Sequence, residues 1–276
     1  MKPSISIGSQ QIQLPQIVFR ASLSEAFSAA KTAGFDAVDL FLYSCDEISK
    51  STLRKLSDDH CIHVALFSAF GDLSAKGISL GSPDAALLKE FFRLAPYHLE
   101  IAAELGSIVP IGFSRGVRKT DETHEEYVER LSDSIRRYDA LAGEFGVRLA
   151  IEPINRYEIN SLNTVGEALS MIEAGNLSHT GLLLDLFHMN IEEVSITTEI
   201  VRSFAHVFHI HFTDSNRCPP GMGHMNLKDI YILLRGLGYD GYLAIESLPY
   251  PTSQTAAKLG LEYFSMLERQ AKVFYA

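Results

Sequence analysis

Short hydrophobic runs alternate with amphipathic segments along the whole chain. Between the runs, apolar residues recur every three or four positions, as in an amphipathic helix, for example over 22–34, 125–146 and 227–238. The pattern predicts a repeated strand and helix unit, with eight strands at residues 16–19, 37–42, 62–68, 107–113, 148–154, 181–187, 207–213 and 242–248.

Local signals at the helix ends agree with this pattern. Gly34, Gly146 and Gly238 each close a helical segment just before the next hydrophobic run, where a left-handed backbone conformation commonly ends a helix. Thr164 is followed three residues later by Glu167, which is the pattern of a capping box. We therefore expect a helix to begin after the fifth strand.

Eight hydrophobic strands, each followed by a helix, indicate a parallel sheet covered by helices. At this length the closed solution is an α/β fold, a single (β/α)8 TIM barrel spanning residues 1–276. An open, doubly wound sheet is the alternative. Its dinucleotide-binding version loses support because no G-x-G-x-x-G follows the first predicted strand.

Composition narrows the class of partner. The formal net charge of −10 argues against a nucleic acid or an anionic membrane surface. The three cysteines are scattered, which is typical of a reducing compartment, and no run approaches the roughly 20 apolar residues of a membrane helix. We expect a cytoplasmic protein whose partner is a small molecule.

Four consecutive predicted strands end in a residue that can bind a metal. Carboxyl ends of barrel strands meet at one face, where TIM-barrel active sites lie. Three carboxylates and an imidazole gathered there would repel one another without a cation. The sequence therefore predicts one divalent ion at Glu152, Asp185, His211 and Glu246, with Mn²⁺ as the first choice and Mg²⁺, Co²⁺ or Zn²⁺ as the alternatives.

Four stretches of the C-terminal half carry a family resemblance. They are IEPINRYE (151–158), DLFHMNIEE (185–193), HFTDSNRCPPGMGH (211–224) and IESLPYP (245–251). The chain resembles the sugar isomerase/epimerase superfamily with a xylose-isomerase-like barrel, and within it the ketose 3-epimerases of the tagatose/psicose epimerase group. The resemblance implies the same four metal ligands. It also implies that Glu152 and Glu246 are the catalytic acid/base pair.

The resemblance further implies that Glu158, His188 and Arg217 bind the oxygens of the substrate. Arg115 follows the fourth predicted strand and adds a guanidinium near the same face. Because guanidinium groups match carboxylate and phosphate geometry, a keto-sugar acid or a sugar phosphate becomes a candidate substrate. The stretches around Arg115, Arg156 and Pro249 also resemble a subgroup that epimerises keto-hexonates such as tagaturonate.

The predicted function is a divalent-metal-dependent isomerase, an epimerase acting beside the ketone of a keto-sugar or keto-sugar acid. Two bases on opposite faces would remove and return a proton through an enediolate. An aldose–ketose isomerase or a dehydratase like those acting on inosose or dehydroshikimate remains an alternative, and an AP endonuclease-like nuclease a remote one. A homo-oligomer, dimer or tetramer, is implied by the resemblance alone.

Overall fold

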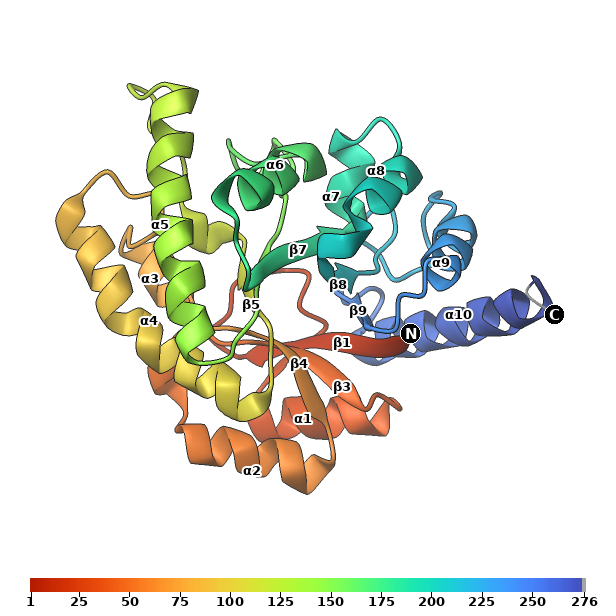
Figure 1. Cartoon of the computed structure of the whole chain (residues 1–276). Coiled ribbons are helices and arrows are strands. Elements are labelled where there is room, and N and C mark those ends of the chain that lie inside the picture. Colours follow the sequence, from red (N-terminus) through yellow and green to blue (C-terminus); the bar gives the residue numbers. More distant parts are fainter. Residues whose placement is uncertain (275–276) are drawn as a thin grey trace.

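Parallel strands follow one another round a ring, and helices cover its outside (Figure 1). The structure, a computed structural model, describes residues 1–274. The strand order is β4-β3-β1-β9-β8-β7-β6-β5, with β2 paired to β1. This arrangement confirms the predicted TIM barrel. The strands are β1 (Lys2–Ser9), β2 (Phe19–Ala21), β3 (Ala37–Phe41), β4 (His63–Ser68), β5 (Val109–Ile111), β6 (Leu149–Ile151), β7 (Thr180–Asp185), β8 (Val207–His211) and β9 (Tyr242–Ile245).

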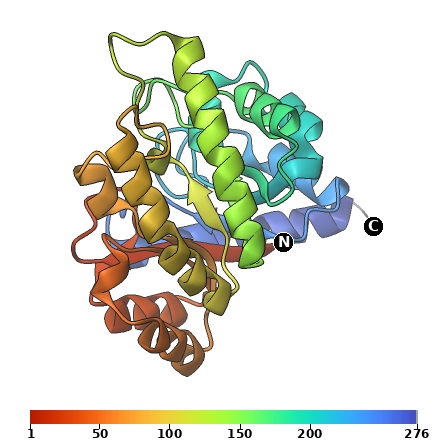
Figure 2. The same cartoon turned by 60° about the vertical axis from the view of Figure 1, so that its left-hand side comes forward.

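Helices connect the strands, and Figure 2 brings α4 and α5 to the front of the molecule. The α-helices are α1 (Leu23–Thr32), α2 (Lys50–His60), α3 (Gly71–Ala75), α4 (Ala85–Leu105), α5 (His124–Glu144), α6 (Val165–Gly175), α7 (Leu186–Glu192), α8 (Ile196–Ser203), α9 (Leu227–Gly236) and α10 (Ser253–Phe274), with short 3-10 helices at Cys45–Glu47, Phe113–Arg115 and Phe204–His206. No helix within residues 1–274 is long and apolar enough to cross a membrane.

The expected helix ends are confirmed. Thr164 caps α6, and its side chain and that of Glu167 form the predicted capping box. Gly34, Gly146 and Gly238 have φ values of 96°, 65° and 80°, so each occupies the left-handed region. The local sequence therefore determines where these helices begin and end.

The first predicted strand was wrong. The first strand of the ring is β1, which pairs with β3 and β9, whereas the predicted run 16–19 leads into the short β2, which pairs with β1 only. The reason lies in the composition of β1. Ser4 and Ser6 are fully buried and alternate with Ile5 and Ile7, so this strand is buried on both faces without being a continuous hydrophobic run.

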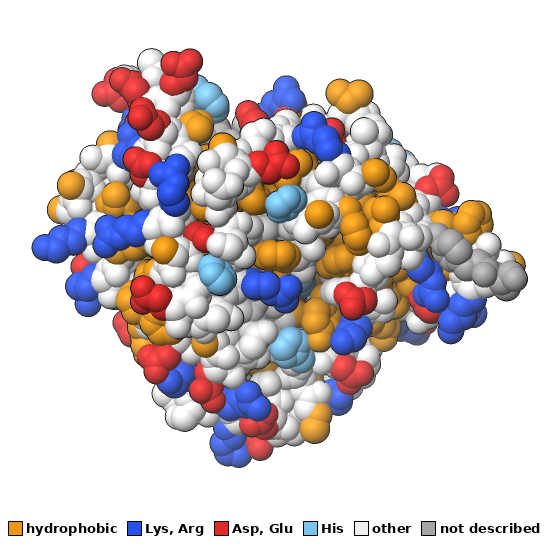
Figure 3. Space-filling model, viewed as in Figure 1, with side chains coloured by type: hydrophobic (Ala, Val, Ile, Leu, Met, Phe, Trp, Pro, Cys, Tyr) orange, Lys and Arg blue, Asp and Glu red, His pale blue; other side chains and the backbone are white. Residues whose placement is uncertain are grey.

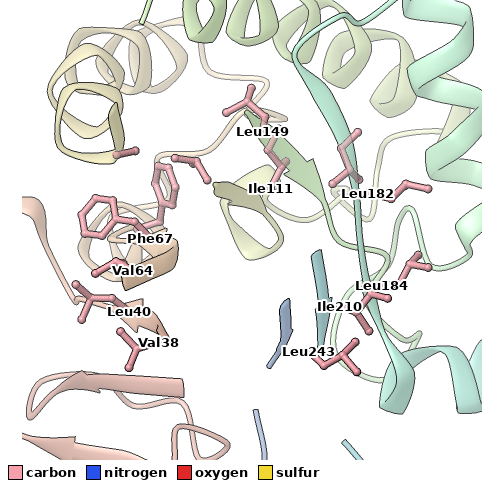
Figure 4. Close-up of a cluster of buried hydrophobic side chains, with 14 of the residues drawn as sticks. Val38, Leu40, Val64, Phe67, Ile111, Leu149, Leu182, Leu184, Ile210 and Leu243 are labelled. Carbon is pink, nitrogen blue, oxygen red and sulfur yellow. The ribbon is translucent and has the colours of Figure 1, made fainter. Parts of the chain in front are cut away.

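Alternation along the strands divides the core into two layers. Outward-facing residues such as Val38, Leu40 and Leu149 pack with the helices; they and their neighbours come from strands round the ring (Figure 4). A smaller cluster fills the ring itself and contains Phe41, Leu66 and other residues of the opposite parity. At the carboxyl ends of the later strands the inward positions are instead polar, and the candidate site lies there.

The ring closes most weakly between β4 and β5. These two strands share an isolated bridge from Leu66 to Ile108, with the Phe67 amide donating to the Ile108 carbonyl at 2.9 Å and the Ile108 amide donating to Ala65 at 3.0 Å. The other neighbours in the ring pair over longer ladders, for example β7 with β8 from Leu182 to Asp185. The barrel therefore has a seam at Ile108.

Candidate active site and metal centre

The barrel brings the four predicted ligands together at the carboxyl ends of adjacent strands. Asp185 ends β7 and lies in register with His211, which ends β8. Glu152 and Glu246 directly follow β6 and β9. Each of the four offers one ligand atom, and these atoms all lie within 4.8 Å of one another. We call these four residues the candidate centre.

His211 lies at the middle of the candidate centre. Its Nδ1 atom is 3.3 Å from Asp185 Oδ2, 3.3 Å from Glu246 Oε2 and 3.5 Å from Glu152 Oε1. Burial opposes protonation of this ring, but the carboxylates around it, Glu246 first among them, raise the pKa of His211 well above its ordinary value. The imidazole therefore carries positive charge in the cluster when no metal is bound.

Asp185 combines a structural and a chemical role. Its Oδ1 atom accepts a hydrogen bond from the Phe187 amide at 2.8 Å and so caps α7, while Oδ2 faces His211. Burial would raise the pKa of Asp185, but the charges of Arg217, His188 and His211 outweigh it, and the pKa lies below its ordinary value. The helix cap thus fixes the direction of an ionised carboxylate.

Gly112 makes room for Glu152, a role that the sequence analysis missed. A Cβ atom at position 112 would lie 2.8 Å from Glu152 Oε2. Burial would raise the pKa of Glu152, but the neighbouring His211 and His188 lower it below the ordinary value. Glu152 is therefore ionised and has the space to move beside the pocket. The signal for this role was the small residue that follows β5.

Arg217 also enters the candidate centre. Its guanidinium donates to Asp185 Oδ2 and to Glu246 Oε2, and it lies 4.9 Å from the centroid of the Phe187 ring. Its backbone has a φ of 61°, and the Leu248 amide donates to its carbonyl at 2.7 Å. The loop after β8 is therefore held in a strained conformation that directs a cation at the carboxylates.

His188 is fixed by a residue that the sequence analysis did not single out. Asn155 is buried, and its Nδ2 atom lies 2.7 Å from His188 Nδ1 and 2.8 Å from Glu158 Oε1. His188 Nε2 is 3.9 Å from Asp185 Oδ2. Asn155 thus connects two of the predicted substrate-binding residues. His188 lines the pocket, whereas Glu158 is partly exposed and is not among the residues that line it.

Arg115 does not face the pocket as we had expected. It is fully buried, and its Nη1 and Nη2 atoms donate to backbone carbonyls, including Gly112 and Glu152 at 2.9 Å and Ser161 at 3.0 Å. Burial lowers the pKa of Arg115 to about 10, so the side chain stays charged at neutral pH. The physical reason is that several carbonyls at the ends of β5 and β6 converge on one point and require a multiple donor there.

A pocket of about 350 Å³ opens onto the candidate centre, within the usual range for small-molecule sites. Glu152, His211 and Glu246 are among the residues that line it, and the rest of its wall is mainly apolar. The wall includes Ile12, Leu14, Phe41, Tyr43, Leu66, Phe70 and Phe113. The outer surface in Figure 3 mixes acidic and basic side chains, without a continuous basic patch on the face shown.

The donor atoms fit a divalent cation. Metal–ligand distances of about 2.0–2.2 Å place ligand atoms roughly 3–4.4 Å apart, close to the spread of the four atoms here. Three carboxylates with one imidazole suit Mn²⁺, Mg²⁺ or Co²⁺. These ligand atoms are held by strand ends and a helix cap, so the chain prepares the site before any ion binds.

Comparisons with known proteins agree with the fold and the enzyme class. Residues 27–267 match the family described as xylose isomerase-like TIM barrel. The chain is 30% identical over 239 residues to D-psicose 3-epimerase of Agrobacterium fabrum (strain C58), covering 82% of this chain and 78% of that protein. It is 25% identical over 240 residues to a probable ketose 3-epimerase of Synechocystis sp. (strain PCC 6803), covering 83% and 80%.

A solved structure of L-ribulose 3-epimerase superposes with a TM-score of 0.82 at 20% identity, covering 100% of this chain and 98% of that one, which shows the shared fold. The sequence relatives are carbohydrate epimerases, so the predicted resemblance and the predicted enzyme class, an isomerase, are both confirmed. With the barrel, the strand-end residues and a match over most of its length, the chain belongs to the xylose isomerase-like TIM barrel family.

Proposed function

We propose that the chain is a divalent-metal-dependent epimerase that inverts the carbon next to the ketone of a keto-sugar. The observation that carries the proposal is the placement of two glutamates at one pocket. Glu152 and Glu246 both line it, and both carboxylates lie within 3.5 Å of the same atom, His211 Nδ1. Their strands are separated by β7 and β8, so the two carboxylates approach the pocket from different sides.

Glu152 and Glu246 act as the acid/base pair. One glutamate removes the proton from the carbon beside the ketone, and the resulting enediolate then receives a proton on its opposite face from the other. Each well-positioned acid or base contributes about 10²–10⁴ to the rate. The mainly apolar wall of the pocket lowers the local dielectric constant, which strengthens electrostatic interactions at the reacting carbon.

A divalent ion bound at the candidate centre would supply Lewis acidity, which stabilises the negative charge of the enediolate. Glu152, Asp185, His211 and Glu246 would hold it. His188 and Arg217 line the pocket beside these four, and we propose that they orient the substrate oxygens. Glu158 would act on the orientation of His188 through Asn155, which contacts both side chains.

A neutral keto-sugar fits this pocket better than an acidic one. Among the residues that line it, the basic side chains are His188, His211 and Arg217, and each contacts a carboxylate. Arg115, the residue that favoured a keto-sugar acid, donates to backbone carbonyls instead. A substrate carboxylate away from the ion would therefore meet no uncommitted cationic side chain among the described residues that line the pocket, and would lose hydration without gaining an ion pair to the protein.

Solvent deuterium exchange tests the proposal. The enzyme is stripped with a chelator, reloaded with Mn²⁺ and incubated in D₂O with ketohexoses, keto-hexonates or ketose phosphates. The ion is removed again before NMR. We expect deuterium at the carbon beside the ketone of a neutral ketose, together with its epimer, and loss of both in the stripped enzyme.

Substitutions distinguish a catalytic role of the two glutamates from a general loss of folded protein. Glu246→Gln and Glu152→Gln should each reduce epimer formation about 10²–10⁴-fold. Glu268→Gln is the matched control, because Glu268 pairs with Tyr231 and Arg235 on the outer layer. Full epimerisation by either pocket variant would contradict the two-glutamate mechanism.

The same spectra distinguish the alternatives. An aldose–ketose isomerase would yield an aldose, and a dehydratase would lose water irreversibly. Exchange with keto-hexonates alone would show that the substrate is acidic. If no compound exchanges while the enzyme binds Mn²⁺ tightly, the epimerase proposal fails for these sugars.

A further inference from the structure

A second buried polar cluster lies inside the barrel, beneath the candidate centre. Asp39 of β3 is fully buried, and its Oδ2 atom is 2.6 Å from His209 Nε2 on β8. Its Oδ1 atom accepts a hydrogen bond from Ser4 of β1 at 3.2 Å. We call Ser4, Asp39 and His209 the Asp39 cluster.

The Asp39 cluster is expensive to bury and does not touch the pocket. Asp39 sits in the run AVDLF and faces inward with Phe41, where an aliphatic side chain would pack without desolvating a charge. None of the three residues lines the pocket. A role in the reaction must therefore pass through another residue, and the one within reach is His211.

His211 presents its two ring nitrogens to two different groups. Nδ1 faces the three carboxylates of the candidate centre, whereas Nε2 lies at an ion-pair distance of 3.3 Å from Asp39 Oδ2. This contact lacks the geometry of a hydrogen bond, and Nε2 has no other hydrogen-bond partner among residues 1–274, so Asp39 is the group that can orient its proton electrostatically. A ligating imidazole needs a lone pair on the metal side and therefore carries its proton on the other nitrogen. A carboxylate at Nε2 favours this tautomer and makes Nδ1 a stronger ligand.

The partners of Asp39 hold it in place for this contact. His209 Nδ1 meets no hydrogen-bond partner among residues 1–274, so the proton of this ring belongs on Nε2, where it donates to Asp39 Oδ2. Ser4 fixes the other carboxylate oxygen. The three residues come from β1, β3 and β8, so the position of Asp39 is defined from different sides of the barrel.

We propose that Asp39, held by His209 and Ser4, is a positioning residue that keeps His211 in the tautomer and orientation required to bind the divalent ion through Nδ1. The proposal rests on the metal-dependent function proposed above. In this proposal the Asp39 cluster supports binding of the ion and has no direct role in binding the substrate.

The affinity for Mn²⁺ tests this role directly. Free Mn²⁺ is measured by EPR during titration of the stripped protein, which needs no turnover. We expect one ion per chain, and a Kd that rises about 10–100-fold in Asp39→Asn, the usual effect of losing such a partner. Saturating Mn²⁺ should restore most of kcat in this variant, because Asp39 does not contact the substrate.

Asp139→Asn is the matched control. Asp139 is also buried, but it accepts hydrogen bonds from the His179 amide and Thr180 Oγ1 at the start of β7, away from the candidate centre. Its replacement should leave the Kd for Mn²⁺ unchanged. If Asp39→Asn does not fold, His209→Gln serves instead, with a several-fold rise in Kd expected because Asp39 loses one of its two supports.

The tautomer of His211 gives an independent readout. In the Zn²⁺-loaded protein, ¹⁵N NMR of the imidazole should show the proton on Nε2 and the ion on Nδ1. Unchanged Mn²⁺ affinity in Asp39→Asn, or a second ion bound per chain, would overturn the proposal. A wild-type protein that binds Mn²⁺ more tightly than Asp39→Asn but does not epimerise would contradict the proposed function and leave this inference standing.

Discussion

Two regions of the molecule each hold a buried aspartate, a buried histidine and a buried arginine, and the partners of these residues differ between the two regions. In the framework between strands and helices, each meets backbone, a hydroxyl or aromatic rings. At the candidate centre, each meets other charged side chains. The framework residues are Asp139, His98 and Arg115, and their counterparts at the centre are Asp185, His211 and Arg217.

The difference shows that residue type and burial do not identify a functional group in this barrel. Arg115 and Arg217 both follow a strand end, and both are buried. Arg115 satisfies carbonyls that would otherwise lack donors, whereas Arg217 balances carboxylates that would otherwise repel one another. The groups that a buried side chain contacts therefore determine whether it stabilises the fold or serves the reaction. Substituting the matching residue in each region tests this distinction.

The largest difference is expected between substitutions of the two aspartates, Asp185 and Asp139. Asp185→Asn removes a charge from the candidate centre, and we expect kcat/KM to fall about 10²–10³-fold at saturating Mn²⁺, as when preorganised charge is lost from an active site. Asp139→Asn should keep kcat/KM and lower the free energy of unfolding by about 1–3 kcal/mol, because the groups that donate to it lose their charged acceptor. Steady-state kinetics and urea unfolding measure the two effects.

The arginine pair should show the reverse asymmetry. Arg115→Met leaves several buried carbonyls without donors, so the free energy of unfolding should fall by about 3 kcal/mol or more. Arg217→Met should instead lower kcat/KM about 10–10²-fold, the equivalent of ~1.5–3 kcal/mol for a charged hydrogen bond. An active-site defect in folded Arg115→Met at saturating Mn²⁺, with the stability unchanged, would break the comparison.

The histidine pair predicts a pH dependence of stability. Burial lowers the pKa of His98, which stacks against Phe67 and Phe70, to about 3. Below pH 6.5 the unfolded chain binds a proton at His98 that the folded chain does not, so this stability is complete above 6.5 and is lost as the pH falls towards 3.

The slope is about 1.4 kcal/mol per pH unit, or roughly 2 kcal/mol between pH 6.5 and 5. Urea unfolding of wild type and His98→Phe over this range measures it, and equal slopes would contradict the assignment. His211 has the opposite sign in the metal-free protein. Its raised pKa gives stability that is present below pH 6.5 and lost as the pH rises through the folded value.

The smallest effect concerns the space beside Glu152. Gly112→Ala brings a Cβ atom to 2.8 Å from the Glu152 carboxylate, whose flexible end can move away. We expect kcat to fall about tenfold, because small misplacements of a catalytic group are costly, while the Kd for Mn²⁺ changes less. A larger fall in metal affinity than in kcat would show that Glu152 serves the ion more than the proton.

The sequence was most informative where polarity interrupts a strand. Glu152, Asp185, His211 and Glu246 could be found because each ends a hydrophobic run, and parallel strands bring their ends together. Asp39 carries the same chemistry in the middle of a run, where a lone carboxylate gave no periodic signal.

Other roles depended on contacts between distant segments. The sequence shows that Arg115 follows a strand, and we therefore assigned it to the substrate. The sequence does not show that backbone carbonyls of distant residues, such as Gly112 and Leu162, converge on its guanidinium. Asn155 contacts His188, and Gly112 leaves space for Glu152. Both contacts join residues far apart in the sequence, so only the folded structure reveals them. The sequence analysis missed β1 because its buried residues Ser4 and Ser6 are polar, so the segment does not form a continuous hydrophobic run.

The seam at Ile108 lies on the side of the ring that forms the pocket wall, away from most of the strands that carry the candidate centre. The four residues of the candidate centre lie at the carboxyl ends of β6, β7, β8 and β9, which are hydrogen-bonded neighbours in the sheet. The pocket wall near the seam comes from β4, β5 and their loops, including Ser68, Pro110 and Phe113. Substitutions on that side can reshape the space for the sugar while the opposite side keeps its spacing, so a new substrate preference can evolve without rebuilding the chemistry.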